Sequence, residues 1–103
     1  MTNEIVTVIV NIKVKPGVEE RAKQVLLSAV APTCAETGCI TYDLHQSASD
    51  PTEFLFHENW ANQEAFDAHA ASTAEHRLAL RQQLSELVDG PARLTFWRRV
   101  SRS

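Results

Sequence analysis

Glycine is scarce in this chain of 103 residues, and its three glycines, Gly17, Gly38 and Gly90, lie far apart. A dinucleotide fingerprint or a phosphate-binding loop needs several closely spaced glycines, because the backbone must approach the phosphates without a Cβ in the way. The sequence therefore excludes the familiar nucleotide cradles. Nothing in it marks a flavin, nicotinamide or ATP site.

Basic residues are also few, with 10 Lys and Arg against 13 Asp and Glu and a net charge of −3. Proteins that bind nucleic acid neutralise its phosphates with a basic surface. The composition therefore predicts that nucleic acid is not a partner.

Cysteines and long apolar runs are scarce as well. Cys34 and Cys39 lack the CxxC spacing of metal and redox motifs. The first apolar run is too short and too interrupted to span a bilayer, and no basic segment precedes it. We therefore expect a cytoplasmic protein, not a membrane protein, with both cysteines as buried free thiols.

The length and composition fit one globular domain over residues 1–103, since 44% of the residues are hydrophobic and 22% are charged. A chain this short buries a smaller share of its surface than a larger domain does. Pairing with a second copy would hide more apolar area, so we expect association.

The first third of the chain predicts a strand and a helix. Residues 5–14 alternate and are rich in β-branched side chains, which is typical of a strand. From residue 18 apolar positions recur at helical spacing, and Pro32 is expected to kink or end that helix. One face of the strand carries Val6, Val8, Val10, Ile12 and Val14.

The rest of the chain is predicted to form a hairpin, two helices and a last strand. Strands over 39–46 and 53–60 flank a cluster of turn residues. Asn62 is expected to cap a short helix that ends at His69, and Ser72 with Glu75 fits a capping box that starts another. Residues 89–91 stop that helix, and residues 92–100 form the final strand.

This order of elements is the split βαβ pattern of a ferredoxin-like α+β fold, with an antiparallel sheet and helices on one face. Such a layer leaves the other sheet face open. We expect the row from Val6 to Val14 to line that open face and to pack against a second copy.

The histidines do not predict a metal site. His69 and His76 are seven residues apart, but the predicted cap at Ser72 separates them. His45 and His57 could lie opposite each other in the hairpin if its turn is centred near residues 50–51. A third ligand is not evident, and zinc sites need three or four.

The segment from His57 to His69 is the strongest candidate for chemistry. Its aromatic residues Trp60 and Phe66 are first interpreted as core packing at a strand–helix junction. His69 shares the apolar side of its helix with Ala65 and Phe66. A histidine there is more often a hydrogen-bonded structural group than a catalyst, yet it is the best general base that the chain offers.

The same region resembles the antibiotic biosynthesis monooxygenase domain family, which includes quinol monooxygenases. The likeness extends to "VNIKVKPGVEE" near the start and "GPARLTF" near the end, so it covers nearly the whole chain. Its motifs are individually short, and their order and spacing carry the assignment. They are Gly38-Cys39-x-x-Tyr42, then Glu58-x-Trp60, then Ala65 and His69.

The resemblance implies a homodimer that forms a dimeric α+β barrel, and an aromatic substrate oxidised by O₂ without a metal or another cofactor. An electron-rich phenol or quinol is deprotonated and passes an electron to O₂ in an apolar pocket. On this reading His69 is the base, Asn11 or Tyr42 holds the anion, and Phe56 and Trp60 are pocket walls.

Three alternative functions stay open beside this one. Haem-degrading relatives have an Asn at the position of Asn11, but their Trp in place of His69 argues against haem cleavage here. Isomerases of small phosphorylated dicarbonyls would need a cation, which Arg93 or Arg98 could supply. A binding module without catalysis is the third alternative.

Overall fold

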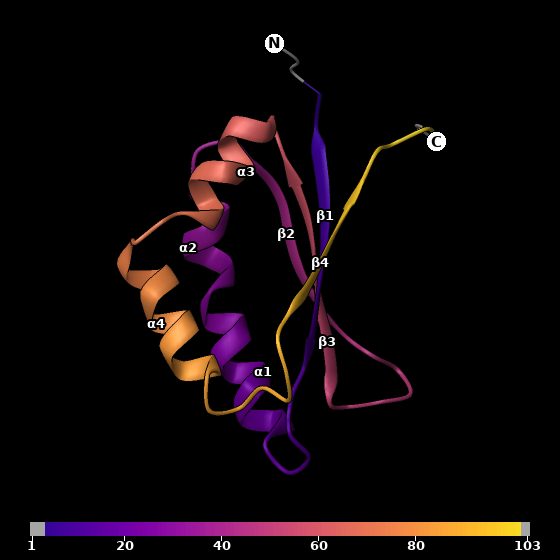
Figure 1. The fold of residues 1–103 in the computed structure, drawn as a ribbon, viewed down its shortest axis with the longest axis vertical. Coiled ribbons are helices and arrows are strands. Elements are labelled where there is room, and N and C mark those ends of the chain that lie inside the picture. The colour runs from indigo at the N-terminus through magenta and orange to yellow at the C-terminus, as the bar shows by residue number, and fades with distance from the viewer. Residues whose placement is uncertain (1–3, 102–103) are drawn as a thin grey trace.

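A computed structural model describes residues 4–101 as a four-stranded antiparallel sheet with helices on one face (Figure 1). The strand order β2-β3-β1-β4 is that of the predicted ferredoxin-like α+β fold, and this prediction is confirmed. In this part of the chain no helix is long and apolar enough to cross a membrane. The elements are β1 Val6–Lys13, α1 Glu19–Ser28, α2 Val30–Cys34, β2 Cys39–Gln46, β3 Glu53–Trp60, α3 Gln63–Ala70, α4 Glu75–Leu84 and β4 Arg93–Trp97.

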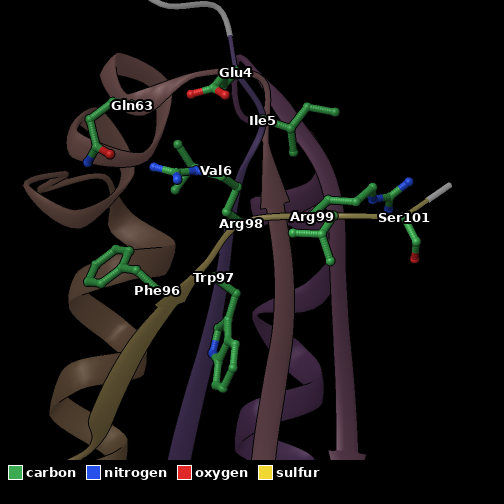
Figure 2. A pocket seen from close by; sticks show the side chains of 10 residues that line it. Glu4, Ile5, Val6, Gln63, Phe96, Trp97, Arg98, Arg99 and Ser101 are labelled. Carbon is green, nitrogen blue, oxygen red and sulfur yellow. The ribbon is translucent and has the colours of Figure 1, made fainter.

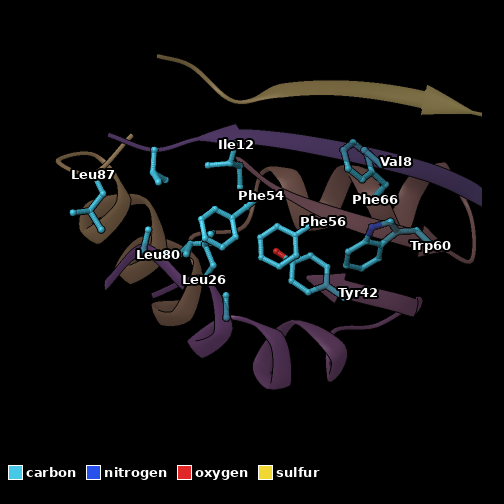
Figure 3. Close-up of a cluster of buried hydrophobic side chains, with 13 residues drawn as sticks. Val8, Ile12, Leu26, Tyr42, Phe54, Phe56, Trp60, Phe66, Leu80 and Leu87 are labelled. Atoms are coloured by element: carbon cyan, nitrogen blue, oxygen red, sulfur yellow. The ribbon is translucent and has the colours of Figure 1, made fainter. Parts of the chain in front are cut away.

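The interior lies between the sheet and the helices, where rings from β2, β3 and α3 form a row (Figure 3). Because directly paired residues in an antiparallel sheet share a face, the register fixes which side chains point inward. Val8 pairs with Glu58, and Glu58 pairs with Tyr42, so all three face the helices. Their neighbours along each strand, such as Thr7 and Asn59, lie on the open face.

The predicted role of the valine row was wrong. Val8, Ile12 and Val14 are 0%, 4% and 0% exposed in the single chain, because they pack against the helices. Val6 and Val10 pack against the same core. Alternation shows which residues share a face, but this strand is apolar on both sides, so the pattern could not tell which side the helices cover.

The helix boundaries follow local hydrogen bonding. The helix breaks between α1 and α2 near Pro32, which has no N–H for the carbonyl of Ser28. Asn62 caps α3 as predicted, since its Oδ1 accepts a hydrogen bond from the Ala65 N–H at 2.8 Å. The predicted capping box is wrong, because Ser72 Oγ accepts from the Ala74 N–H and α4 begins only at Glu75.

Both cysteines are free thiols, as predicted, but they are not both buried. Cys39 is partly buried at the start of β2, whereas Cys34 is exposed at the end of α2. No pattern in the sequence predicted that the last residue of this short helix would be exposed to solvent.

Candidate active site

Three of the predicted site residues stand together on the face of the sheet that the helices cover. Tyr42 and Phe56 stack with ring centroids 4.4 Å apart, and Trp60 is fully buried beside them (Figure 3). Aromatic walls of this kind exclude water and strengthen electrostatic interactions near them.

His69 joins these rings from α3. Its imidazole lies 4.5 Å from the Trp60 ring and 5.8 Å from the Tyr42 ring, measured between centroids. It is 5% exposed, so the prediction that it occupies the inner side of its helix is confirmed. The cap at Asn62 fixes where the helix starts, and this sets the turn on which His69 points to the sheet.

A carboxylate that the sequence did not indicate holds His69 in place. Glu36 accepts a hydrogen bond from His69 Nδ1 at 2.9 Å through one oxygen, and its other oxygen lies 2.6 Å from His76 Nε2. Glu36 is 33 and 40 residues away from these histidines, so no local pattern links them. When Nδ1 donates to a carboxylate, the lone pair is left on Nε2, and a general base needs that tautomer.

Electrostatics favour a neutral His69. Burial and the charge of Arg77 lower the pKa of His69, and the hydrogen bond to Glu36 only partly reverses this effect. Burial alone would raise the pKa of Glu36, but the hydrogen bonds from His76 and His69 outweigh it, so this pKa lies below its ordinary value. At neutral pH the pair is therefore a carboxylate and a neutral imidazole that can accept a proton.

A fully buried carboxyl, Glu58, faces the same interior. It is 2% exposed and accepts a hydrogen bond from Trp60 Nε1 at 2.9 Å. Burial raises the pKa of Glu58 to about 6. Burial, followed by the nearby charge of Glu58, also raises the pKa of the Tyr42 hydroxyl, so that this hydroxyl stays protonated and remains a donor.

Glu58→Gln should make the protein more stable at neutral pH. Because the folded-state pKa of Glu58 is raised from 4.5 to about 6, the folded chain holds a proton between these values that the unfolded chain has lost. Stability therefore falls as the pH rises through that window. Glutamine keeps an acceptor for Trp60 but carries no charge, so we expect a gain of about 1–2 kcal/mol at pH 7.5 and almost none at pH 4.5.

Urea denaturation of the variant and the unsubstituted chain at both pH values measures this difference, since the other titrating groups are common to the two proteins. A variant that is less stable at pH 7.5 would show that the ionised carboxylate is stabilising.

Asn11 does not join the site. It pairs with Leu55 on the open face of the sheet, where both line a cavity of about 280 Å³ with His45.

His57 and Asn59 share that face, as predicted, but His57 pairs with Asp43. The prediction that His45 and His57 lie directly opposite each other is therefore wrong, because the turn places His45 across from Leu55 instead.

A larger cavity, of about 920 Å³, lies at the end of β4 (Figure 2). Phe96 lines it and points toward α3. The centroid of the Phe96 ring lies 5.3 Å from that of Phe66 on α3. Phe66 in turn lies 6.3 Å from His69. Phe66 therefore connects the cavity wall with the buried site. Arg98 also lines this cavity, whereas Arg93 pairs with Asn11 on the open face.

Comparison with known proteins finds matches that cover most of the chain. The family model described as "Antibiotic biosynthesis monooxygenase" matches residues 5–89. A Mycobacterium tuberculosis protein named "Putative monooxygenase Rv0793" is 34% identical over 90 residues, which cover 87% of this chain and 86% of that protein. An uncharacterised Synechocystis protein is 30% identical over 85% of this chain, which spans only 58% of that protein's length.

Solved structures extend the likeness to the fold. A Pseudomonas aeruginosa protein superposes with a TM-score of 0.86 at 30% identity, over 98% of this chain and 99% of the other. The solved structure of the same M. tuberculosis protein gives a TM-score of 0.84 at 30% identity, over 97% and 99% of the two chains.

Proposed function

The chain belongs to the antibiotic biosynthesis monooxygenase family, and from this premise we propose that it is a cofactor-independent monooxygenase that oxidises a phenolic or quinol-type small molecule with O₂. His69 is the general base of this reaction. Tyr42, Phe56 and Trp60 surround the substrate ring.

The observation that supports this proposal best is the Glu36–His69 pair packed against aromatic rings. The 2.9 Å hydrogen bond at Nδ1 leaves Nε2 as the proton acceptor. Transfer of the substrate O–H proton to Nε2 produces an electron-rich anion. The adjacent rings give an apolar surface on which an aromatic anion can lie and from which bulk water is excluded.

The reaction needs no electrons from outside. The anion passes an electron to O₂, and recombination of the two radicals forms a carbon–oxygen bond and a peroxide. Loss of water breaks the O–O bond. One quinol and one O₂ thus give one hydroxyquinone and one water, so the substrate supplies all four electrons that O₂ accepts.

The proposed pocket differs from the sequence-based one in one residue. Asn11 is left out, since it faces the other side of the sheet. The Tyr42 hydroxyl, which burial keeps protonated by raising its pKa, remains as a hydrogen-bond donor to the substrate anion. Phe66 must move for a substrate to reach His69 from the larger cavity, because its ring contacts both Phe96 and His69.

Oxygen consumption with a panel of quinols and polyphenols tests the proposal. We expect uptake of one O₂ per substrate and incorporation of one ¹⁸O atom from ¹⁸O₂. Because burial lowers the pKa of His69, the rate should rise with pH as this imidazole loses its proton below its ordinary range, and should be level at neutral pH. Proton exchange or isomerisation of phosphorylated dicarbonyls without oxygen uptake would instead support the isomerase alternative, and binding without turnover would support a binding module.

We also propose that the protein is a homodimer that pairs through the open face of the sheet, in place of the valine row. Ile9 and Trp97 lie on that face, and Trp97 is 59% exposed. Ile9→Glu would place an unpaired charge in such an interface, at a cost of several kcal/mol. We expect this variant to elute as a folded monomer in size-exclusion chromatography with light scattering.

Leu27→Glu is the matched control, because Leu27 is an exposed apolar residue on α1, on the helix side of the molecule. It should leave the dimer unchanged. An unsubstituted chain that is monomeric at micromolar concentration would contradict the pairing.

A further inference from the structure

Arg77, on α4, carries a buried donor without a hydrogen-bond partner in the described part of the chain. It follows His76 on α4, and the His76 ring binds the carboxylate that orients His69. The Nε of Arg77 is buried and has no hydrogen-bond partner within residues 4–101. The side chain also forms no ion pair within 4.0 Å in this part of the chain.

The charge of Arg77 acts on groups from three other elements. Burial is the largest influence on the pKa values of Tyr42 on β2, Glu58 on β3 and His69 on α3; the Arg77 charge opposes the rise at Tyr42 and Glu58 and adds to the fall at His69. Leu80, one turn further along α4, is buried, so Arg77 lies on the side of this helix that faces the interior. Glu58 does not form an ion pair with Arg77 among residues 4–101, and the Glu58 carboxylate instead accepts the 2.9 Å hydrogen bond from Trp60.

An arginine stays charged at any physiological pH, and a buried N–H without an acceptor costs free energy. Such a group beside a neutral base is suited to a ligand that brings its own negative charge. The planar fork of a guanidinium also donates well to a phenolate or carboxylate oxygen and stacks on aromatic rings.

We propose that Arg77 binds the ionised oxygen of an acidic aromatic substrate, so that the substrate is held as its phenolate. This inference rests on the proposed function only in taking His69 as the base. The substrate O–H bond breaks, an N–H bond forms at His69 Nε2, and the oxygen that has become negative accepts a hydrogen bond from the Arg77 guanidinium. The site therefore favours a substrate bound as its anion over the same substrate bound in the neutral form.

Binding of 4-nitrophenol under anaerobic conditions tests the inference without turnover, because only its ionised form absorbs visible light strongly. The unsubstituted protein should bind the phenolate and lower the apparent pKa of the bound probe by about one unit or more, which is a tenfold preference for the anion. A protein that binds only the neutral phenol overturns the inference, whatever the variants do.

Arg77→Gln should weaken binding of the nitrophenolate by about 10–100-fold, and Arg77→Lys should lose less because it keeps the charge without the fork. Arg81→Gln is the matched control on the same helix, since Arg81 donates to the backbone carbonyls of Ser72 and Ala70. It should bind the probe normally. Equal affinity in Arg77→Gln and the unsubstituted chain overturns the inference.

This assay separates the two proposals. Arginine-dependent phenolate binding without any oxygen uptake would support the anion site and contradict the monooxygenase. Oxygen uptake that is unchanged in Arg77→Gln, with unchanged probe binding, would support the monooxygenase and overturn the anion site.

Discussion

His69→Gln is expected to lower kcat by about 10²–10⁴-fold while the protein stays folded, because the glutamine amide cannot take a proton at neutral pH. Its amide can still donate to Glu36, which now accepts from His69 Nδ1 at 2.9 Å. KM should change much less than kcat, since the aromatic walls remain in place. Steady-state oxygen uptake together with thermal melting separates the effect on chemistry from the effect on folding.

Glutamine is a better replacement here than alanine. From the sequence, His69→Ala looks like truncation of a partly exposed helix residue, with a stability cost on the order of 1 kcal/mol. The structure changes that expectation, since His69 is 5% exposed and packs 4.5 Å from Trp60. Alanine would leave a cavity and an unpaired acceptor at Glu36, so we expect its cost to be about 2–4 kcal/mol.

His57→Gln is the control, since His57 lies on the open face, opposite the proposed pocket. It should keep nearly full turnover. Full activity in His69→Gln would show that His69 is structural, and loss of activity in His57→Gln alone would place the chemistry on the other face of the sheet.

Gly38→Ala is expected to destabilise the fold by about 2–5 kcal/mol, the largest stability effect that we predict for a single methyl group. Gly38 has a φ of +82°, a region that side-chain-bearing residues adopt at a cost of about 1–2 kcal/mol. A Cβ there would also come within 2.4 Å of the Ala65 Cβ on α3. Overpacking of this kind adds about 1–3 kcal/mol.

Gly17→Ala is the matched control, because its φ is +95° but no atom lies within 4 Å of the added Cβ. Gly17→Ala should lower the stability only by the cost of placing a side-chain-bearing residue at a positive φ. The double variant Gly38→Ala with Ala65→Gly relieves the contact and should recover part of the loss. If Gly17→Ala and Gly38→Ala melt at the same temperature, the close approach of the β2 entrance to α3 is not a constraint on the fold.

The sequence predicted those features whose physical cause is local. The hairpin strands 39–46 and 53–60 and the cap at Asn62 appear in the structure as expected, because alternation, turn residues and capping hydrogen bonds involve neighbours in the chain. The inner position of His69 follows from helical periodicity for the same reason. The failed capping box at Ser72 shows the limit of such reasoning, since a neighbouring turn competes for the same hydroxyl.

Only the tertiary structure decided which side of β1 is the interior and which charged groups meet around His69. β1 is apolar on both faces, so its pattern fixes the grouping of Val8 and Ile12 but not the side that the helices cover. Glu36, His76 and Arg77 come from helical and loop segments that look like solvated surface in the sequence. They converge on the site because the sheet and the four helices bring distant segments together, and contacts of that separation leave no periodic trace in the chain.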